Sequence, residues 1–358
     1  MMGSVRALGR HQSRLKHLFA SSTGISANGG GGGGQCRGGE NLMAVAEVST
    51  SAWLEQQTNP PKGSIRPRSF MRPEMVSPRL DVPRHIPRPP YVGAAEPPVM
   101  AEVIQIQDEA GVAGMRAAGR LASLIRDFVG SLVRPGVTTD EIDKAAHEAI
   151  IDSGAYPSLL GFGGFPKSVS TSINECICSG IPNLRALKKG DIVNIDVNIY
   201  FNGYHAETSE TYICGVVDKS VKQFVEVARD CLDTAIAICG PGVEFREIGA
   251  IITDIADGCN YHVVEHVIGH GVGSLFHSAP AIYHHYNYKS GKMAIGQTFT
   301  IEPALSMGTV KALQWDDMWT TVTADGSYSA QFKHTVLITE SGAEILTPIK
   351  EVEADDSE

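Results

Sequence analysis

The sequence repeats itself at a spacing of 106 residues, and this duplication limits the folds open to the chain. Pro135-Gly136-Val137, followed by Glu141-Ile142, recurs 106 residues later as Pro241-Gly242-Val243, followed by Glu247-Ile248. At the same spacing, Gly190 and Asp196 correspond to Gly296 and Glu302. Two independent matches at one spacing indicate two halves built on the same plan.

Apolar periodicity and turn signals predict the same order of elements in each half. Two helices separated by a Pro-Gly pair come first, and strands follow. Asn202-Gly203 between two strand-like runs predicts a two-residue hairpin. The predicted helices span 112–133, 139–153, 220–239 and 244–257, and the predicted strands span 191–201, 204–214, 296–302 and 329–339. This order predicts an α+β fold class with pseudo-twofold symmetry and a cleft lined by both halves.

Charge and proline content divide the chain into segments. Residues 1–100 carry 12 Lys and Arg against 6 Asp and Glu, whereas residues 101–358 carry 18 against 34. A basic start with no acidic residue before Glu40 is typical of a mitochondrial or chloroplast transit peptide. Residues 60–98 hold 11 of the 19 prolines, which excludes a helix or an inner strand there. We expect a transit peptide over 1–45, a Pro-rich extended arm over 46–100, a folded domain over 101–350 and an acidic tail over 351–358.

Composition also excludes several classes of protein. The acidic balance of the predicted domain argues against nucleic-acid binding through phosphate contacts. No run approaches 18 apolar residues, so a membrane-spanning helix is not expected. The seven cysteines contain no C-x-x-C pair, which argues against a structural zinc ribbon.

Three carboxylates are candidates for a shared site. Asp196 and Glu302 occupy matched positions inside apolar strands, where a carboxylate is costly to bury unless it is paired or bound to a metal. With a turn at 202–203, residue 198 pairs with 207, so Asp196 and Glu207 lie diagonally on one face of the hairpin. The alternative is that each is a solvated residue at a strand edge.

A histidine among glycines is the other chemical signal. His270 lies in Gly269-His270-Gly271-Val272-Gly273, and His277 follows Phe276. Glycine lets the backbone approach a site closely, and imidazole is a common metal ligand and acid–base group. Carboxylates with one imidazole favour Mn²⁺, Fe²⁺, Co²⁺ or Zn²⁺, and a metal pair would suit peptide hydrolysis. A lone histidine is more often a core residue, and that alternative stays open from the pattern alone.

Five segments, 161–182, 190–212, 267–277, 299–306 and 329–339, together resemble a known family. The sequence is similar to the type I methionine aminopeptidases, metallopeptidases with the pita-bread fold, and most resembles their organellar forms. The resemblance implies a site for two divalent metals and removal of the initiator methionine from peptides or nascent chains with a small second residue. The basic start predicts a mitochondrial or chloroplast location, and composition and charge predict no membrane or nucleic-acid partner. Proximity to a ribosome is a further expectation, with residues 60–98 as a candidate docking segment.

The resemblance assigns roles to individual residues. Asp196, His270 and Glu302 match metal ligands, and His277 matches a histidine that contacts substrate. His277 and Glu302 are the expected catalytic residues. The methionine pocket would be lined by Phe162, Phe165, Phe276 and Trp319.

Three positions depart from the family pattern. Glu207 stands where the family has a ligand Asp, Lys333 where it has a ligand Glu, and Ser179 where it has a substrate-contacting His. Three carboxylates and one ammonium leave two negative charges, enough to balance one dication. Two interpretations follow: a methionine aminopeptidase, weakened or with a single metal, or a catalytically inactive pita-bread protein that binds N-terminal Met peptides. Proline-directed cleavage is a third interpretation, less favoured because the 161–182 segment matches the type I pattern.

Overall fold

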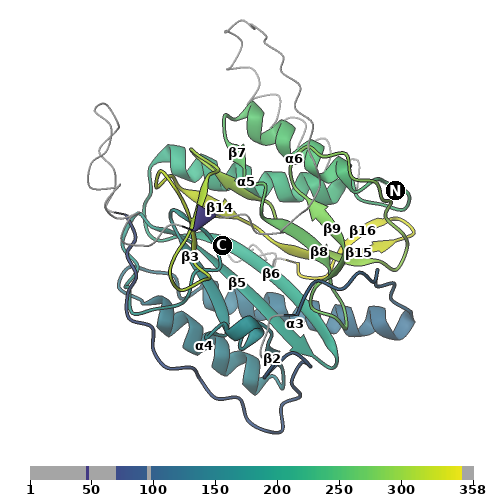
Figure 1. Cartoon of the computed structure of the whole chain (residues 1–358), viewed down its shortest axis with the longest axis horizontal. Helices are drawn as coiled ribbons and strands as arrows, with labels where there is room; N and C mark the ends of the chain where they lie inside the picture. The colour runs from purple at the N-terminus through teal and green to yellow at the C-terminus, as the bar shows by residue number, and fades with distance from the viewer. Residues whose placement is uncertain (1–45, 48–69, 95–97, 349–358) are drawn as a thin grey trace, which may run out of the picture.

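The computed structural model describes residues 46–47, 70–94 and 98–348 (Figure 1). The predicted transit peptide and acidic tail lie outside these residues. Residues 70–94 contain no helix or strand, as the proline content predicts.

Four α-helices and a short 3₁₀ helix carry the helical part of the described chain. They are α3 (Glu109–Gly130), α4 (Thr139–Asp152), α5 (Lys219–Ala237), α6 (Arg246–Gly258) and η1 (Phe162–Gly164). The α4 helix begins with a capping box, in which Thr138 and Glu141 each bond the other's backbone N–H. Asp108 caps α3 by accepting a hydrogen bond from Gly111 N. The four α-helices confirm the two predicted helix pairs, with ends displaced by up to a few residues.

Four strands of the first half form a sheet around one long hairpin. They are β2 (Tyr156–Pro157), β3 (Val169–Ile173), β5 (Ile192–Phe201) and β6 (Tyr204–Ile213), whereas β4 (Cys176–Cys178) pairs with β13 (Thr321–Thr323) of the second half. β6 pairs along one edge of β5, and β3 and β2 pair along the other. Asn202 and Gly203 both have positive φ, as a two-residue turn of this kind needs, and Asn198 pairs with Glu207 as predicted.

The second half supplies the remaining strands. They are β7 (His262–Val263), β8 (Ile268–Gly271), β9 (Ser278–Tyr283), β10 (Thr298–Ile301), β11 (Ala304–Ser306), β12 (Ala312–Gln314), β13 (Thr321–Thr323), β14 (Ser329–Gln331), β15 (His334–Thr339) and β16 (Gly342–Ile345). Five of them form an antiparallel sheet in the order β16-β15-β10-β8-β9. The strand β1 (Ala46–Glu47) pairs in parallel with β12.

The predicted strand 329–339 was wrong as one continuous element. It is divided into β14, which pairs with β11, and β15, which pairs with β10, because the chain changes sheets at Phe332-Lys333. Lys333 instead pairs with Ser209 of β6, through Lys333 N to Ser209 O at 3.0 Å and Ser209 N to Lys333 O at 3.1 Å. The residues between β14 and β15 therefore link the second half to β6 of the first half.

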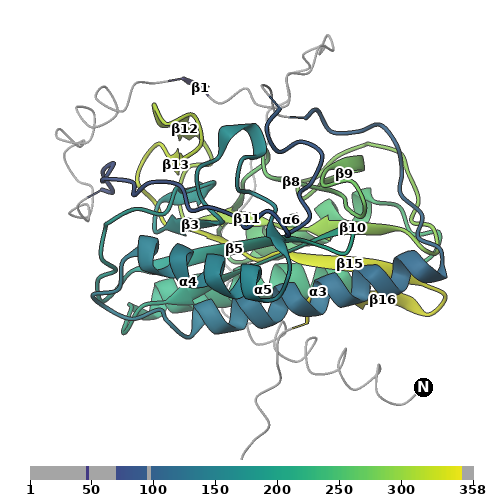
Figure 2. The ribbon, with the colours of Figure 1, turned by 90° about the horizontal axis from the view of Figure 1, so that it is seen from below.

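The helices lie on one side of the strands, and the arm runs beside α4, where Ser77 Oγ donates to Asp140 Oδ1 and His147 Nε2 faces Asp81 O. Figure 2 shows α3, α4 and α5 in one layer below β5, β10 and β15. Apolar side chains of α3 and α4 pack on β3 and β5, and those of α5 and α6 pack on β10 and β15, giving one core per half. None of the helices in the described part of the chain is long and apolar enough to cross a membrane.

Candidate active site

Three carboxylates from both halves converge on one ammonium group. Lys333 Nζ lies 3.1 Å from Asp196 Oδ2, 3.1 Å from Glu207 Oε2 and 3.2 Å from Glu302 Oε2. Asp196 is on β5, Glu207 is on β6, and Glu302 directly follows β10. The structure therefore brings together the matched acids that the duplication singled out, and it places Lys333 between them.

Two histidines lie on the other side of this carboxylate group. His270 Nε2, on β8, is 3.6 Å from Glu207 Oε1 and 3.6 Å from Glu302 Oε1. The rings of His270 and His277 meet edge to face with centroids 4.3 Å apart. Ligand-type atoms of Glu207, His270 and His277 all lie within 4.8 Å of one another. These three residues form a potential metal-binding group.

Burial sets the electrostatics of the site. Burial by itself would lower the pKa of Lys333, but the three carboxylates raise it well above its ordinary value. Burial raises the pKa of both Asp196 and Glu207, against the opposing effect of Lys333. Burial would also raise the pKa of Glu302, but Lys333, His270 and Thr300 bring it below its ordinary value. Burial and nearby positive charge hold the pKa of His277 well below its usual range, so its imidazole is neutral.

His284 positions Glu302, a role that the sequence pattern did not reveal. Its Nδ1 faces Val267 O at 2.9 Å, so this nitrogen carries the proton and donates it. Its Nε2 is then free to accept a hydrogen bond from Glu302 N at 3.0 Å. Thr300 Oγ1 donates to Glu302 Oε1 at 2.7 Å. His284 has no neighbouring glycines of the kind that flank His270, so its local sequence did not distinguish it from an ordinary core histidine.

Ser179 follows β4 with a φ of 57°, a left-handed conformation uncommon outside glycine. Burial is the main cause that raises the pKa of the neighbouring Cys178 thiol, to about 11. The charge of Glu302 raises this pKa further, and the charge of Lys333 lowers it. The substrate contact expected at position 179 stays a prediction. Among the described residues, no hydrogen bond or ion pair joins Ser179 to the three carboxylates.

The expected pocket residues form two aromatic groups. Phe162 meets Phe276 edge to face at 5.2 Å and His277 at 5.0 Å. Phe165 meets Trp319 edge to face at 5.2 Å. The first group thus lies directly against a histidine of the site.

Two further aromatic residues join the first group. His205 stacks on Phe276 at 4.8 Å, and Tyr91 of the arm lies 5.3 Å from Phe162. Sequence reasoning missed both, since His205 looks like an ordinary strand residue and Tyr91 lies in the Pro-rich segment. Only the tertiary attachment of the arm, including the bond of the Tyr91 hydroxyl to Ser158 O, brings Tyr91 here.

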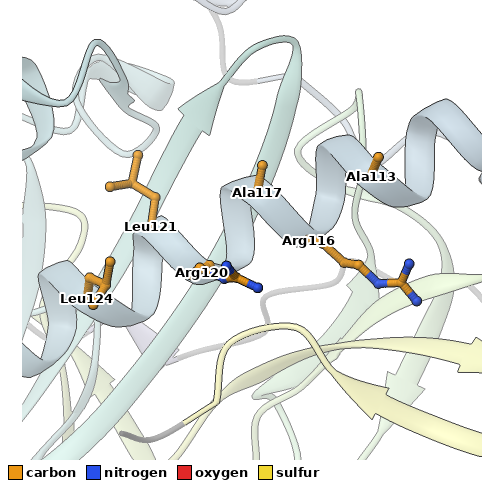
Figure 3. Close-up of a pocket in the computed structure, with 6 residues that line it drawn as sticks. All are labelled: Ala113, Arg116, Ala117, Arg120, Leu121 and Leu124. Carbon is orange, nitrogen blue, oxygen red and sulfur yellow. The ribbon is translucent and has the colours of Figure 1, made fainter.

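A separate hollow lies on the outer side of α3. Figure 3 shows its lining, which consists of Ala113, Arg116, Ala117, Arg120, Leu121 and Leu124. None of the expected site residues contributes to it, so it is unrelated to the carboxylate group.

Comparison with known families identifies the class. The model of metallopeptidase family M24 matches residues 113–340. The chain belongs to this family of metallopeptidases. The matched range contains every expected metal-site residue.

Individual relatives narrow the assignment. The chain is 56% identical over 280 residues to methionine aminopeptidase 1D, chloroplastic/mitochondrial, of Arabidopsis thaliana, covering 78% of this chain and 80% of the relative. It is 46% identical over 281 residues to mitochondrial methionine aminopeptidase 1D of Homo sapiens, covering 78% and 84%. The crystal structure of methionine aminopeptidase from Rickettsia prowazekii superposes with a TM-score of 0.67 at 40% identity, covering 69% of this chain and all of that one. These findings confirm the pita-bread fold and the resemblance to organellar type I enzymes.

Proposed function

We propose that the protein is a methionyl aminopeptidase that removes the N-terminal initiator methionine from peptides or nascent chains with a small second residue. The observation that carries this proposal is the convergence of Asp196, Glu207, His270 and Glu302 beside an aromatic group. It occurs in a chain 56% identical to an enzyme named for this reaction. The apolar rings suit a methionine side chain, and the buried carboxylates suit hydrolysis at the adjacent amide.

A divalent metal follows from the family, and Co²⁺, Mn²⁺, Fe²⁺ or Zn²⁺ are the candidates that this ligand set favours. Lys333 Nζ lies between the three carboxylates, so two dications do not fit beside it. One ion fits on the histidine side. Glu207 Oε1 is buried there without a hydrogen-bond partner among the described residues, and His270 and His277 lie next to it.

The departures are compatible with one ion. Glu207 is longer than Asp by one methylene, which moves its oxygens by about one bond length toward the histidines. The net charge of the three carboxylates and Lys333 balances a single dication. This proposal makes His277 a metal ligand here, whereas the sequence pattern suggested a substrate contact.

A bound dication supplies Lewis-acid polarisation of the scissile carbonyl and lowers the pKa of a coordinated water. The residues of the chain do the remaining work. Phe162 and Phe276 hold the methionine side chain and exclude water from it. Glu302, which is fixed by His284 and Thr300, accepts and returns the proton of the attacking water. Lys333 opposes the effect of burial, which by itself raises the pKa of each neighbouring carboxylate.

The inactive alternative has no support from the relatives cited here, which are named as methionine aminopeptidases. The relatives also carry organellar names, chloroplastic or mitochondrial. We propose a location in one or both of these organelles, where initiator methionine is exposed on newly made chains near ribosomes.

Metal stoichiometry and turnover together test the proposal. We expect native mass spectrometry to find one Mn²⁺ or Co²⁺ per chain, and the loaded protein to release methionine from Met-Ala-Ser. The variant His270→Ala should lose both, while His262→Ala, an exposed histidine outside the site, should lose neither. A folded protein that binds no metal and releases no methionine would refute the proposal. Two ions per wild-type chain would refute the role given to Lys333.

A further inference from the structure

The arm is anchored to the folded part of the chain along much of its length. Val82 and Ile86 are buried in a small cluster with Tyr156 and Leu160. His147 Nε2 lies 3.1 Å from Asp81 O. Met71, near the start of the described arm, is buried in the core of the first half. The arm therefore has a defined path, and its last residues have a defined position.

Both the hydroxyl and the ring of Tyr91 contact the folded domain. Its hydroxyl donates a 2.7 Å hydrogen bond to Ser158 O. Its ring meets Phe162 edge to face at 5.3 Å and lies nearly parallel to Phe276 at 5.8 Å. The ring also lies nearly parallel to His205 at 5.9 Å, and His205 Nδ1 is 2.8 Å from Ser158 Oγ. Tyr91 thus belongs to a cluster of aromatic side chains with Phe162, Phe276 and His205, and His277 contacts Phe162 and Phe276 of this cluster.

The chain returns to the same place after the arm. Ala101 N donates to His277 O at 3.1 Å, and Ala279 N donates to Ala101 O at 2.7 Å. Residues on both sides of the 95–97 segment therefore contact the stretch that carries Phe276 and His277. The contacts of Tyr91 with this stretch are part of a larger attachment of the N-terminal segment to the site.

We propose that Tyr91 is a specificity-determining residue, whose ring forms one wall of the pocket for the N-terminal side chain of the substrate. This inference rests on the proposed function and extends it to a segment outside the family-matched range, which begins at residue 113. A flexible thioether packs favourably against aromatic rings, so three rings around one pocket favour an unbranched side chain containing sulfur.

The exposure of Tyr91 supports a role beyond attachment. The residues that attach the arm are buried, Ile86 with 3% of its surface exposed. Tyr91 and Phe162 are each only half-buried, although they contact one another. Part of each residue is therefore accessible to a substrate.

The test compares Tyr91→Ala, Tyr91→Phe and Ile86→Ala in the full-length protein. We expect Tyr91→Ala to raise KM for Met-Ala-Ser about 10-fold, and to weaken binding of methioninamide in calorimetry to a similar extent, with little change in kcat. Tyr91→Phe, which keeps the ring and loses only the hydroxyl, should stay within about 3-fold of wild type. Ile86→Ala loosens the arm without touching the pocket, and it should lower Tm while leaving KM unchanged.

Each other outcome counts against a specific claim. Wild-type KM and methioninamide affinity in Tyr91→Ala would overturn the inference while leaving the proposed function intact. So would an equal loss in Ile86→Ala, because loosening the arm would then explain the effect. Methioninamide binding that depends on Tyr91, in a protein that does not cleave Met-Ala-Ser, would uphold the inference and overturn the proposed function. Absence of both binding and cleavage would overturn both.

Discussion

Lys333 is a buried cation that forms ion pairs with three carboxylates. Only 6% of its side chain is exposed, and three carboxylate oxygens lie within 3.2 Å of its Nζ. A buried ion pair adds little net stability over an apolar replacement of the whole group, but removal of one partner leaves uncompensated charge. The stability of the folded protein therefore depends on Lys333, which balances the charge of these carboxylates.

We predict that Lys333→Met destabilises the metal-free protein by about 3–5 kcal/mol, because three buried carboxylates lose their counter-charge. Urea denaturation in the presence of a chelator measures this. Added Mn²⁺ should restore more stability to the variant than to wild type, since the metal replaces the missing charge.

The control is Lys222→Met, which removes an exposed lysine paired with Glu226 at 3.9 Å on α5. Surface pairs contribute little, so this variant should unfold within about 0.5 kcal/mol of wild type. Equal stability of the two variants without metal would contradict the account of Lys333.

At the scale of elements, β8 lies between β9 and β10 with almost no space at its glycines. A Cβ added at Gly269 would overlap Thr300 O of β10, and one added at Gly271 would overlap Ala279 O of β9. These neighbours are backbone atoms in a sheet, so they have little freedom to move. The glycines around His270 thus permit the close strand packing that positions the imidazole.

We predict that Gly269→Ala displaces β8, lowers stability by about 2 kcal/mol or more, and weakens metal binding because His270 moves with the strand. Thermal denaturation and metal titration measure the two effects. Gly240→Ala is the control, since its nearest neighbour, Gly342 Cα, would be 3.7 Å from the added carbon. Normal metal affinity in a destabilised Gly269→Ala would refute the positional argument.

The contact between α4 and β3 contains a carboxylate with an unusual pKa. Burial raises the pKa of Asp143 to about 6, although Lys167 and two backbone N–H groups oppose the shift. Its Oδ1 accepts hydrogen bonds from Ser168 N at 2.7 Å and Val169 N at 3.1 Å. An acid with a raised pKa in the folded state favours folding at low pH, and it loses that contribution as the pH rises through the folded value.

We predict that Asp143→Asn removes this pH dependence. Relative to the variant, wild type should lose on the order of 2–3 kcal/mol of unfolding free energy between about pH 4 and pH 7. Denaturation across that range measures the difference, and the exposed Asp152→Asn serves as the control. A difference between wild type and Asp143→Asn that is constant with pH would disprove the assignment.

At the scale of the whole molecule, three departures are grouped in one site of an otherwise typical scaffold. Glu207 and Lys333 are joined by a 3.1 Å ion pair, so their effects are coupled. Ser179 lies at the end of β4, outside that pair. We therefore expect substitutions at 207 and 333 to be non-additive in their effects.

We predict that combining Ser179→His, Glu207→Asp and Lys333→Glu yields a protein that binds two metal ions and cleaves Met-Ala-Ser at least about 100-fold faster. Native mass spectrometry and steady-state kinetics measure the two results. The single variant Ser179→His should still bind one ion. A folded triple variant without increased activity would show that the scaffold, and not only the site, has changed.

Much of the fold could be predicted from local signals. The hairpin at Asn202-Gly203 and the helix pairs followed from turn residues and periodicity, and the 106-residue repeat related Asp196 to Glu302. The break between β14 and β15 was not predictable, because the strand propensity of 329–339 is continuous and the change of sheet is set by pairing partners elsewhere in the chain.

The sequence by itself determined which residue types were available to the site, and it exposed the substitutions at 179, 207 and 333, because these depend only on order along the chain. The tertiary structure decided where they lie. Lys333 meets Asp196 across 137 residues and Glu207 across 126, and Tyr91 reaches Ser158 across 67. Such contacts arise when separate elements bury their apolar faces against each other, and no local pattern specifies which distant side chains then become neighbours.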